Sequence, residues 1–171
     1  MKLAEALAKR SDLNQQIHEL DHRLLRCVQI QVGDNPPEDP EALLSVIERS
    51  FAELQQLVDA IDRTNAASIL EGRPLSSWLS ERNRLKEHRI ILLRVIERAS
   101  VSQMRISKSE VRFISTISAA RLQKQADDLA KAFREIDLKI QAANWNFDLI
   151  TTDQAGADTE NGITADDDAT E

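Results

Sequence analysis

The most reactive side-chain pattern in the chain is His18-Glu19-Leu20-Asp21-His22, which matches the H-E-x-x-H motif of zinc hydrolases. On a helix this spacing puts two imidazoles one turn apart, where they can bind Zn²⁺ while the glutamate acts as general base toward the metal-bound water. A catalytic zinc also needs a third protein ligand and a sheltered cleft. The remaining histidine, His88, lies among Arg84, Lys86 and Arg89, which would repel a divalent cation. We therefore predict no metal and no cofactor, with a metal-dependent hydrolase at this motif as the enzyme alternative.

Basic residues gather in the middle of the sequence. Residues 75–124 contain 11 Lys and Arg against 4 Asp and Glu, whereas residues 1–74 contain 8 against 13. Arg82, Lys86 and Arg89 share one face of a predicted helix, and such a row can follow phosphates. Acids interrupt the segment, and no aromatic side chain lies between the bases to stack on nucleobases. We therefore expect this segment to pack against acidic helices of the same or a neighbouring chain, with nucleic-acid binding as the alternative.

A third polar group, Arg63, Thr64 and Asn65, falls near the end of a predicted helix. Asn65 continues the apolar seam that includes Ile61, where a buried polar side chain can fix the register and oligomeric state of paired helices. Arg63 and Thr64 could instead bind an anion or contact residues 103–117. The residues that we predict to contact a partner are Arg63, Thr64, Asn65, Arg105 and Arg112.

The element that carries the His18–His22 motif is a long helix. Apolar residues recur at steps of three and four, broken only by Arg10, and this heptad seam predicts a helix from about residue 2 to residue 32, ~46 Å long at 1.5 Å per residue. Its members are Leu3, Ala6, Leu13, Ile17, Leu20, Leu24 and Cys27. The same seam places both histidines of the motif on the solvent side.

A second helix is predicted from about residue 40 to residue 65. Gly33 suits the left-handed position after the first helix, Asp39 is a good N-cap, and Pro40 fits the first helical position. The predicted seam is Leu44, Ile47, Phe51, Leu54, Val58 and Ile61. Because the connection between the two helices is short, we expect an antiparallel hairpin.

The rest of the ordered chain is predicted as two more helices and a short β element. Residues 71–74 read as a turn, and a third helix follows, capped by Ser76 or Ser77. The β-branched residues near 103–117 predict a strand or short hairpin, and Ser118 caps the fourth helix. The expected buried positions are Trp78, Leu85, Leu92, Val95 and Ala99 in the third helix, and Leu122, Ala126, Leu129, Phe133, Ile136, Ile140 and Ala143 in the fourth. The fold class is thus mainly α, with a helical domain over 1–150 and an acidic, disordered tail over 151–171.

Several blocks of sequence resemble a bacterial family of uncharacterised helical proteins, some of which carry the label septicolysin. The blocks are Met1–Leu7, Asp62–Ala67, Ser107–Thr116, Leu122–Ala126 and Gln141–Trp145. The resemblance covers nearly all of residues 1–150 and implies an all-helical, oligomeric protein. The family brings no catalytic residues to carry over, and its label implies a pore-forming toxin.

Composition bounds the function further. The chain has 171 residues and one cysteine, Cys27, which excludes an internal disulfide. No apolar run approaches the ~18 residues that span a bilayer, and the first residues lack a signal-peptide core, so we expect a cytoplasmic protein. The long seams are hard to bury within one chain of this size, which favours a homo-oligomer. We therefore predict a non-catalytic, self-assembling helical interaction protein that binds no membrane, with the hydrolase, the nucleic-acid binder and the pore-forming toxin as alternatives.

Overall fold

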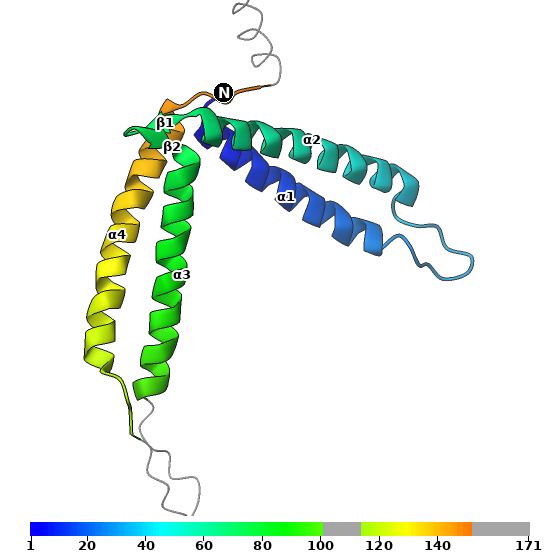
Figure 1. The fold of residues 1–171 in the computed structure, drawn as a ribbon. Helices are drawn as coiled ribbons and strands as arrows, with labels where there is room; N and C mark the ends of the chain where they lie inside the picture. Colours follow the sequence, from blue (N-terminus) through cyan, green and yellow to red (C-terminus); the bar gives the residue numbers. More distant parts are fainter. Residues whose placement is uncertain (101–113, 152–171) are drawn as a thin grey trace, which may run out of the picture. The chain divides into compact units, whose positions relative to one another are not determined.

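The computed structural model describes residues 1–100 and 114–151, and in this part of the chain it shows four α-helices and one pair of short strands (Figure 1). In chain order these are α1 (Leu3–Leu25), α2 (Pro40–Ala67), β1 (Ile69–Leu70), β2 (Arg73–Pro74), α3 (Leu75–Ser100) and α4 (Ala119–Asn146). The predicted mainly-α fold is confirmed. Contacts divide the chain into two compact units, residues 1–68 with 144–171 and residues 69–143. The predicted acidic tail falls almost entirely on 152–171, outside the described residues.

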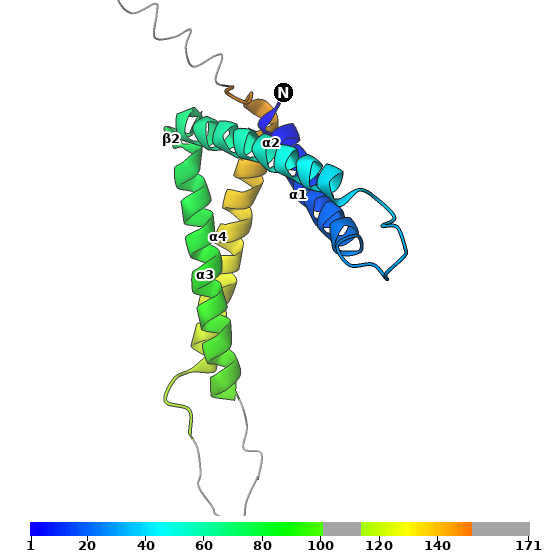
Figure 2. The same cartoon turned by 90° about the vertical axis from the view of Figure 1, so that its right-hand side faces the viewer.

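The first unit is built on the pair α1 and α2, which lie side by side in both views (Figures 1 and 2). The pair is antiparallel, as predicted, because early α1 meets the middle of α2 and late α1 meets its start. Lys9 Nζ lies 2.7 Å from Glu53 Oε1, and Leu20 and Cys27 are buried in one cluster with Leu43.

Helix α1 ends at Leu25, so the prediction of a helix reaching residue 32 is wrong. The amide N–H of Cys27 donates to the carbonyl of Leu24 at 2.8 Å, which tightens the last turn and stops the α-helical ladder. Beyond this turn Val28 and Val32 are exposed. Because β-branched residues have a low helix propensity and these two gain no packing that would offset it, the helix does not continue through them. Gly33 has φ 102° within the connecting loop and not at the helix end.

Helix α2 begins as predicted, but it buries a different face. The Oδ1 atom of Asp39 accepts a hydrogen bond of 3.0 Å from the N–H of Glu41, and Pro40 is the first helical residue. The buried residues of α2 are Leu43, Ser50, Leu57, Ala60, Ile61 and Thr64. Of the predicted seam, Ile61 is buried, whereas Leu44 and Phe51 are exposed. The helix carries two adjacent apolar stripes, and its partners in the unit bury one of them and cover the other only in part.

The two ends of the described chain meet in the first unit. The N–H of Leu3 donates to the carbonyl of Phe147, and the N–H of Leu149 donates to the carbonyl of Met1, both at 2.9 Å. The Nζ atom of Lys2 adds an ion pair of 3.0 Å with Asp148. Residues 147–149 thus run antiparallel to residues 1–3 and cap the start of α1.

The second unit contains the strand pair. Ile69 pairs with Pro74 and Leu70 with Arg73 in antiparallel register, and the two turn residues between them, Glu71 and Gly72, have φ 49° and 81°. Positive φ at both central residues is typical of a type I′ hairpin turn. The turn predicted near 71–74 is therefore present and is flanked by the strands. The predicted strand near 103–117 lies mostly outside the described residues, and residues 114–117 are not in a strand.

Helices α3 and α4 lie side by side in the second unit (Figures 1 and 2). Ser118 caps α4 as predicted, since its Oγ accepts a hydrogen bond of 3.3 Å from the N–H of Arg121. α3 begins at Leu75, before the predicted cap at Ser76 or Ser77. The buried apolar residues of the two helices are Leu75, Trp78, Leu85, Leu122, Ala126, Ile136, Ile140 and Ala143. Val95, which was predicted to be buried, is exposed.

Candidate functional site

The H-E-x-x-H motif lies on the solvent side of α1. His18, Glu19 and His22 are all exposed, and Leu20 between them is buried. The Oε1 atom of Glu19 accepts a hydrogen bond of 2.9 Å from Gln15 Nε2. Among residues 1–100 and 114–151, no group of three or more His, Cys, Asp and Glu side chains is arranged to hold a metal ion. The motif therefore has its two imidazoles one turn apart, but the described part of the chain supplies neither the third ligand nor the shelter that a catalytic zinc needs.

Some basic side chains of the predicted row on α3 are shielded from solvent or ion-paired within the second unit. Arg82 Nη1 lies 3.2 Å from Asp137 Oδ1 of α4, and the side chain of Arg82 is largely shielded from solvent. Arg89 is half-buried, and Lys86 alone of the three is exposed. An arginine that is ion-paired within the fold offers less charge to a phosphate backbone, so this row is a weaker electrostatic feature than its spacing indicates.

The polar group at the end of α2 contains a structural contact that the sequence did not reveal. Thr64 is fully buried; its hydroxyl donates to the carbonyl of Ala60 at 2.7 Å and accepts from the N–H of Ile150 at 2.9 Å. Arg63 and Asn65 are half-buried beside it. Thr64 lies seven residues after Leu57, on the stripe of α2 that the structure shows to be buried, and the sequence alone did not indicate that this stripe is the covered one. The other two predicted binding residues, Arg105 and Arg112, lie outside the described residues.

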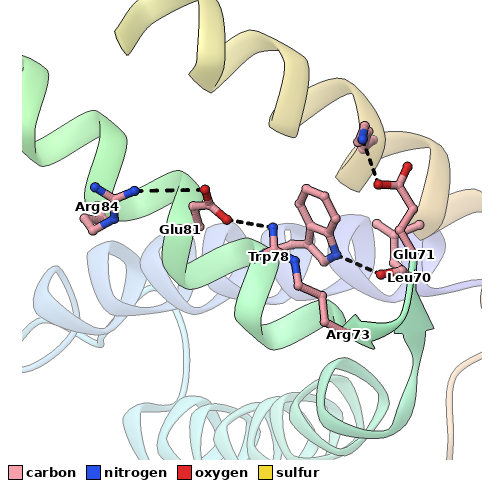
Figure 3. A network of polar contacts seen from close by, with 7 residues as sticks. Leu70, Glu71, Arg73, Trp78, Glu81 and Arg84 are labelled. Carbon is pink, nitrogen blue, oxygen red and sulfur yellow. Dashed lines mark hydrogen bonds and ion pairs between the residues drawn. The ribbon is translucent and has the colours of Figure 1, made fainter.

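A polar network surrounds Trp78 at the hairpin end of the second unit (Figure 3). The guanidinium carbon of Arg73 lies 3.6 Å from the centre of the indole ring, and Lys139 Nζ lies 5.0 Å from it. The indole N–H donates to the carbonyl of Leu70 at 2.9 Å. Both cations are themselves paired: Arg73 with Glu81 at 2.6 Å and Lys139 with Glu71 at 2.7 Å.

This network joins the hairpin to both helices of the unit. The indole belongs to α3, one cation to β2 and the other to α4, so a single ring connects three elements. Cation–π contacts contribute about 0.5–2 kcal/mol each, depending on how far they are desolvated. Because its charges are mutually satisfied, we interpret the network as a structural lock and not as a ligand site.

A second cluster of charges fastens the loop between α1 and α2. Arg23 Nε donates to Glu38 Oε1 at 3.0 Å, and the other guanidinium nitrogen makes a second contact with the same carboxylate. This bidentate hydrogen bond lowers the pKa of Glu38 below its ordinary value and raises the pKa of Arg23. Both groups are open to solvent, so the pair orients the loop more than it stabilises the fold.

The first unit has a second line of apolar side chains on α2 that other residues cover only in part. It is here called the α2 stripe. It consists of Leu44, Ile47, Phe51, Leu54 and Val58. Phe51 is 53% exposed and Leu44 is exposed, whereas the other three are half-buried. The positions follow the a and d spacing of a heptad, so they form one continuous line along the helix. These residues are the predicted seam without Ile61, which is buried. Ile47 packs against the buried cluster of the α1–α2 pair, so the stripe is partly covered and is most open at Leu44 and Phe51.

None of the helices among the described residues is sufficiently long and apolar to cross a membrane.

Comparison with known proteins gives a family but no activity. Residues 10–149 match DUF6847, a family of unknown function. The crystal structure of a functionally unknown conserved protein from Corynebacterium diphtheriae is similar, with 35% sequence identity and a TM-score of 0.81 over 88% of this chain and 99% of that chain. No curated protein matches. Neither description contains the septicolysin label, so the predicted resemblance is confirmed only as far as an uncharacterised family.

Proposed function

This chain belongs to the DUF6847 family, and we propose that it is a non-catalytic helical protein that assembles with further copies of itself. The observation that carries the proposal is the α2 stripe. An amphipathic helix needs one apolar face to pack in its own fold, and α2 has a second one that continues over four turns. Phe51 is 53% exposed, so covering it would contribute about half of the ~1.5–3 kcal/mol that full burial of such a side chain supplies.

The arrangement of the stripe favours a helical partner. Leu44, Phe51 and Val58 recur every seven residues, and such a line is matched best by knobs from another helix. A small-molecule site would instead need a concave pocket with convergent polar groups. The stripe is convex because it lies along the outside of a single helix.

The proposal is tested by measuring the mass of the full chain in solution. Light scattering after size-exclusion chromatography at low micromolar concentration should give a discrete multiple of 19.3 kDa. The Phe51→Ser variant should shift the mass toward that of one chain, since it removes the most exposed member of the stripe. Leu138→Ser is the matched control, because Leu138 on α4 is also exposed but lies outside the stripe. A wild-type chain that remains monomeric at all concentrations would refute the proposal.

The hydrolase alternative at His18, Glu19 and His22 has a separate test. Protein purified without an affinity tag is analysed for bound zinc, and our proposal expects far less than one zinc per chain. One tightly bound zinc that is lost in both His18→Ala and His22→Ala would favour the hydrolase.

A further inference from the structure

We propose that the α2 stripe of one copy docks on the outer face of α3 of a second copy, so that the assembly is built from unlike surfaces and not from two identical ones. This inference rests on the self-assembly proposed above and specifies which surface is the partner. It follows from the charges that border the two exposed apolar faces.

Acidic residues border the α2 stripe. On a helix the nearest neighbours of a side chain lie three or four residues away, and for Leu44, Phe51 and Val58 the charged residues at these distances are Glu41, Glu48 and Asp62. All three are exposed, and no lysine or arginine occupies any of these positions. Two copies of the stripe facing each other would bring acid against acid, which costs several kcal/mol at an interface. Pairing of the stripe with itself is therefore disfavoured.

The outer face of α3 has the opposite character. Ile91 is 48% exposed, and Val95, one turn further on, is also exposed. The side chains three or four residues from this pair include Arg94, Arg98 and His88, with Glu87 as the single acid. All four are exposed. The buried side of α3 is defined by Trp78 and Leu85, and helical spacing puts this basic-bordered apolar pair on a flank of α3 beside that buried side.

The two faces complement each other in charge. Each presents at least partly exposed apolar side chains on a helix, five along the α2 stripe and two on α3, and one has an acidic border where the other has a mainly basic one. Complementary borders fix the register of helices whose apolar residues supply the affinity, as e and g charges do in coiled coils. Because every copy carries both faces, the contact can occur twice in a two-fold dimer or repeat from copy to copy in a ring or a filament.

Charge reversal distinguishes this arrangement from all others. The first variant carries Glu48→Lys and Asp62→Lys on α2, and the second carries Arg94→Glu and Arg98→Glu on α3. Each variant alone juxtaposes like charges, so its dissociation constant should rise at least about tenfold relative to wild type. An equimolar mixture of the two should assemble again, because the reversed α2 border then meets the reversed α3 border. A chain with all four substitutions should assemble by itself for the same reason.

The control for the α2 variant is Asp12→Lys with Asp21→Lys, which makes the same change in net charge as that variant at exposed positions on α1. It should assemble as wild type does, and circular dichroism should show equal helicity for all variants. Assembly that is weakened only by the α2 reversals and not restored by mixing would overturn this inference and leave self-assembly intact. A monomeric wild type would overturn both.

Discussion

Each of the two units packs a pair of long helices, but the two pairs are held together by different kinds of contact. In the first unit the backbones of α1 and α2 pack close together, whereas those of α3 and α4 lie further apart. Small residues such as Ala6, Ser50 and Ala60 are buried along the first pair, and small side chains allow close backbone approach. The second pair instead has the indole of Trp78 and the Arg82–Asp137 ion pair between or beside its helices.

The difference extends to how each unit is fastened. Backbone hydrogen bonds between residues 1–3 and 147–149, together with the buried Thr64, fasten the first unit. Paired charges around an aromatic ring fasten the hairpin to the helices of the second. Close apolar packing loses free energy when volume is removed, whereas exposed charge pairs respond to salt and pH. The comparison therefore predicts a graded series of mutational effects.

The largest effect is expected from Ile61→Ala in α2. Ile61 is 2% exposed, and truncating it leaves a cavity in the tightly packed first unit, which should lower the free energy of unfolding by about 2–5 kcal/mol. Urea denaturation followed by circular dichroism measures this. Leu25→Ala, at an exposed position, is the control and should change the free energy by less than ~0.5 kcal/mol. Equal losses in the two variants would contradict the assigned packing.

The next effect is expected from Thr64→Val, which keeps the volume but removes the hydroxyl. The N–H of Ile150 then loses its acceptor, at a cost of about 1–3 kcal/mol. Hydrogen exchange of the Ile150 amide should become faster than in wild type, whereas Thr64→Ser, which retains a hydroxyl, should preserve most of its protection. An unchanged exchange rate in Thr64→Val would show that this contact does not hold residues 147–150.

A smaller effect is expected in the second unit from Trp78→Phe. The substitution removes the hydrogen bond to the carbonyl of Leu70 and weakens the contacts with Arg73 and Lys139, so we expect a loss of about 1–2 kcal/mol. The control is Trp145→Phe, since Trp145 is 63% exposed. Urea denaturation of both variants compares them directly, and a control that loses as much as Trp78→Phe would refute the structural role of the network.

The smallest effect concerns the pH dependence of the Arg23–Glu38 pair. Because the folded-state pKa of Glu38 is lowered, its contribution to stability is present above the ordinary pKa and is lost as the pH falls through the lowered folded-state value. NMR titration of the Glu38 carboxyl should show a midpoint below that of an ordinary glutamate. In Arg23→Met the midpoint should move up, and 1 M salt should reduce the difference. A wild-type midpoint at the ordinary value would contradict the pair.

Salt also separates the two contributions to the proposed assembly. Raising the salt concentration to 1 M screens the charged borders of the α2 stripe and of α3 but leaves the apolar contacts in place. We therefore expect a weaker assembly that still persists at low micromolar concentration. Complete dissociation in salt would assign the affinity to charge instead of to the stripe.

Much of the fold follows from local signals in the sequence. The N-cap at Asp39, the Ser118 cap and the turn at Glu71-Gly72 depend on residues within a few positions of one another, and all three occur in the structure. The α4 seam was likewise predictable, because Leu122, Ala126 and Ile140 follow helical spacing on an otherwise polar helix. The exposure of His18 and His22 followed from their place opposite the α1 seam.

By itself, the sequence determined that the chain forms long amphipathic helices and where most of them begin, since helix periodicity and caps are properties of neighbouring residues. The tertiary structure alone decided which of the two apolar stripes of α2 is covered. It also decided that α1 stops at Leu25 and that residues 147–149 join residues 1–3. These outcomes depend on contacts between residues far apart in the chain. The covered stripe of α2 includes Ser50 and Thr64 and is less apolar in sequence than the other stripe, so only the position of its packing partners makes it the interior and leaves Leu44 and Phe51 exposed.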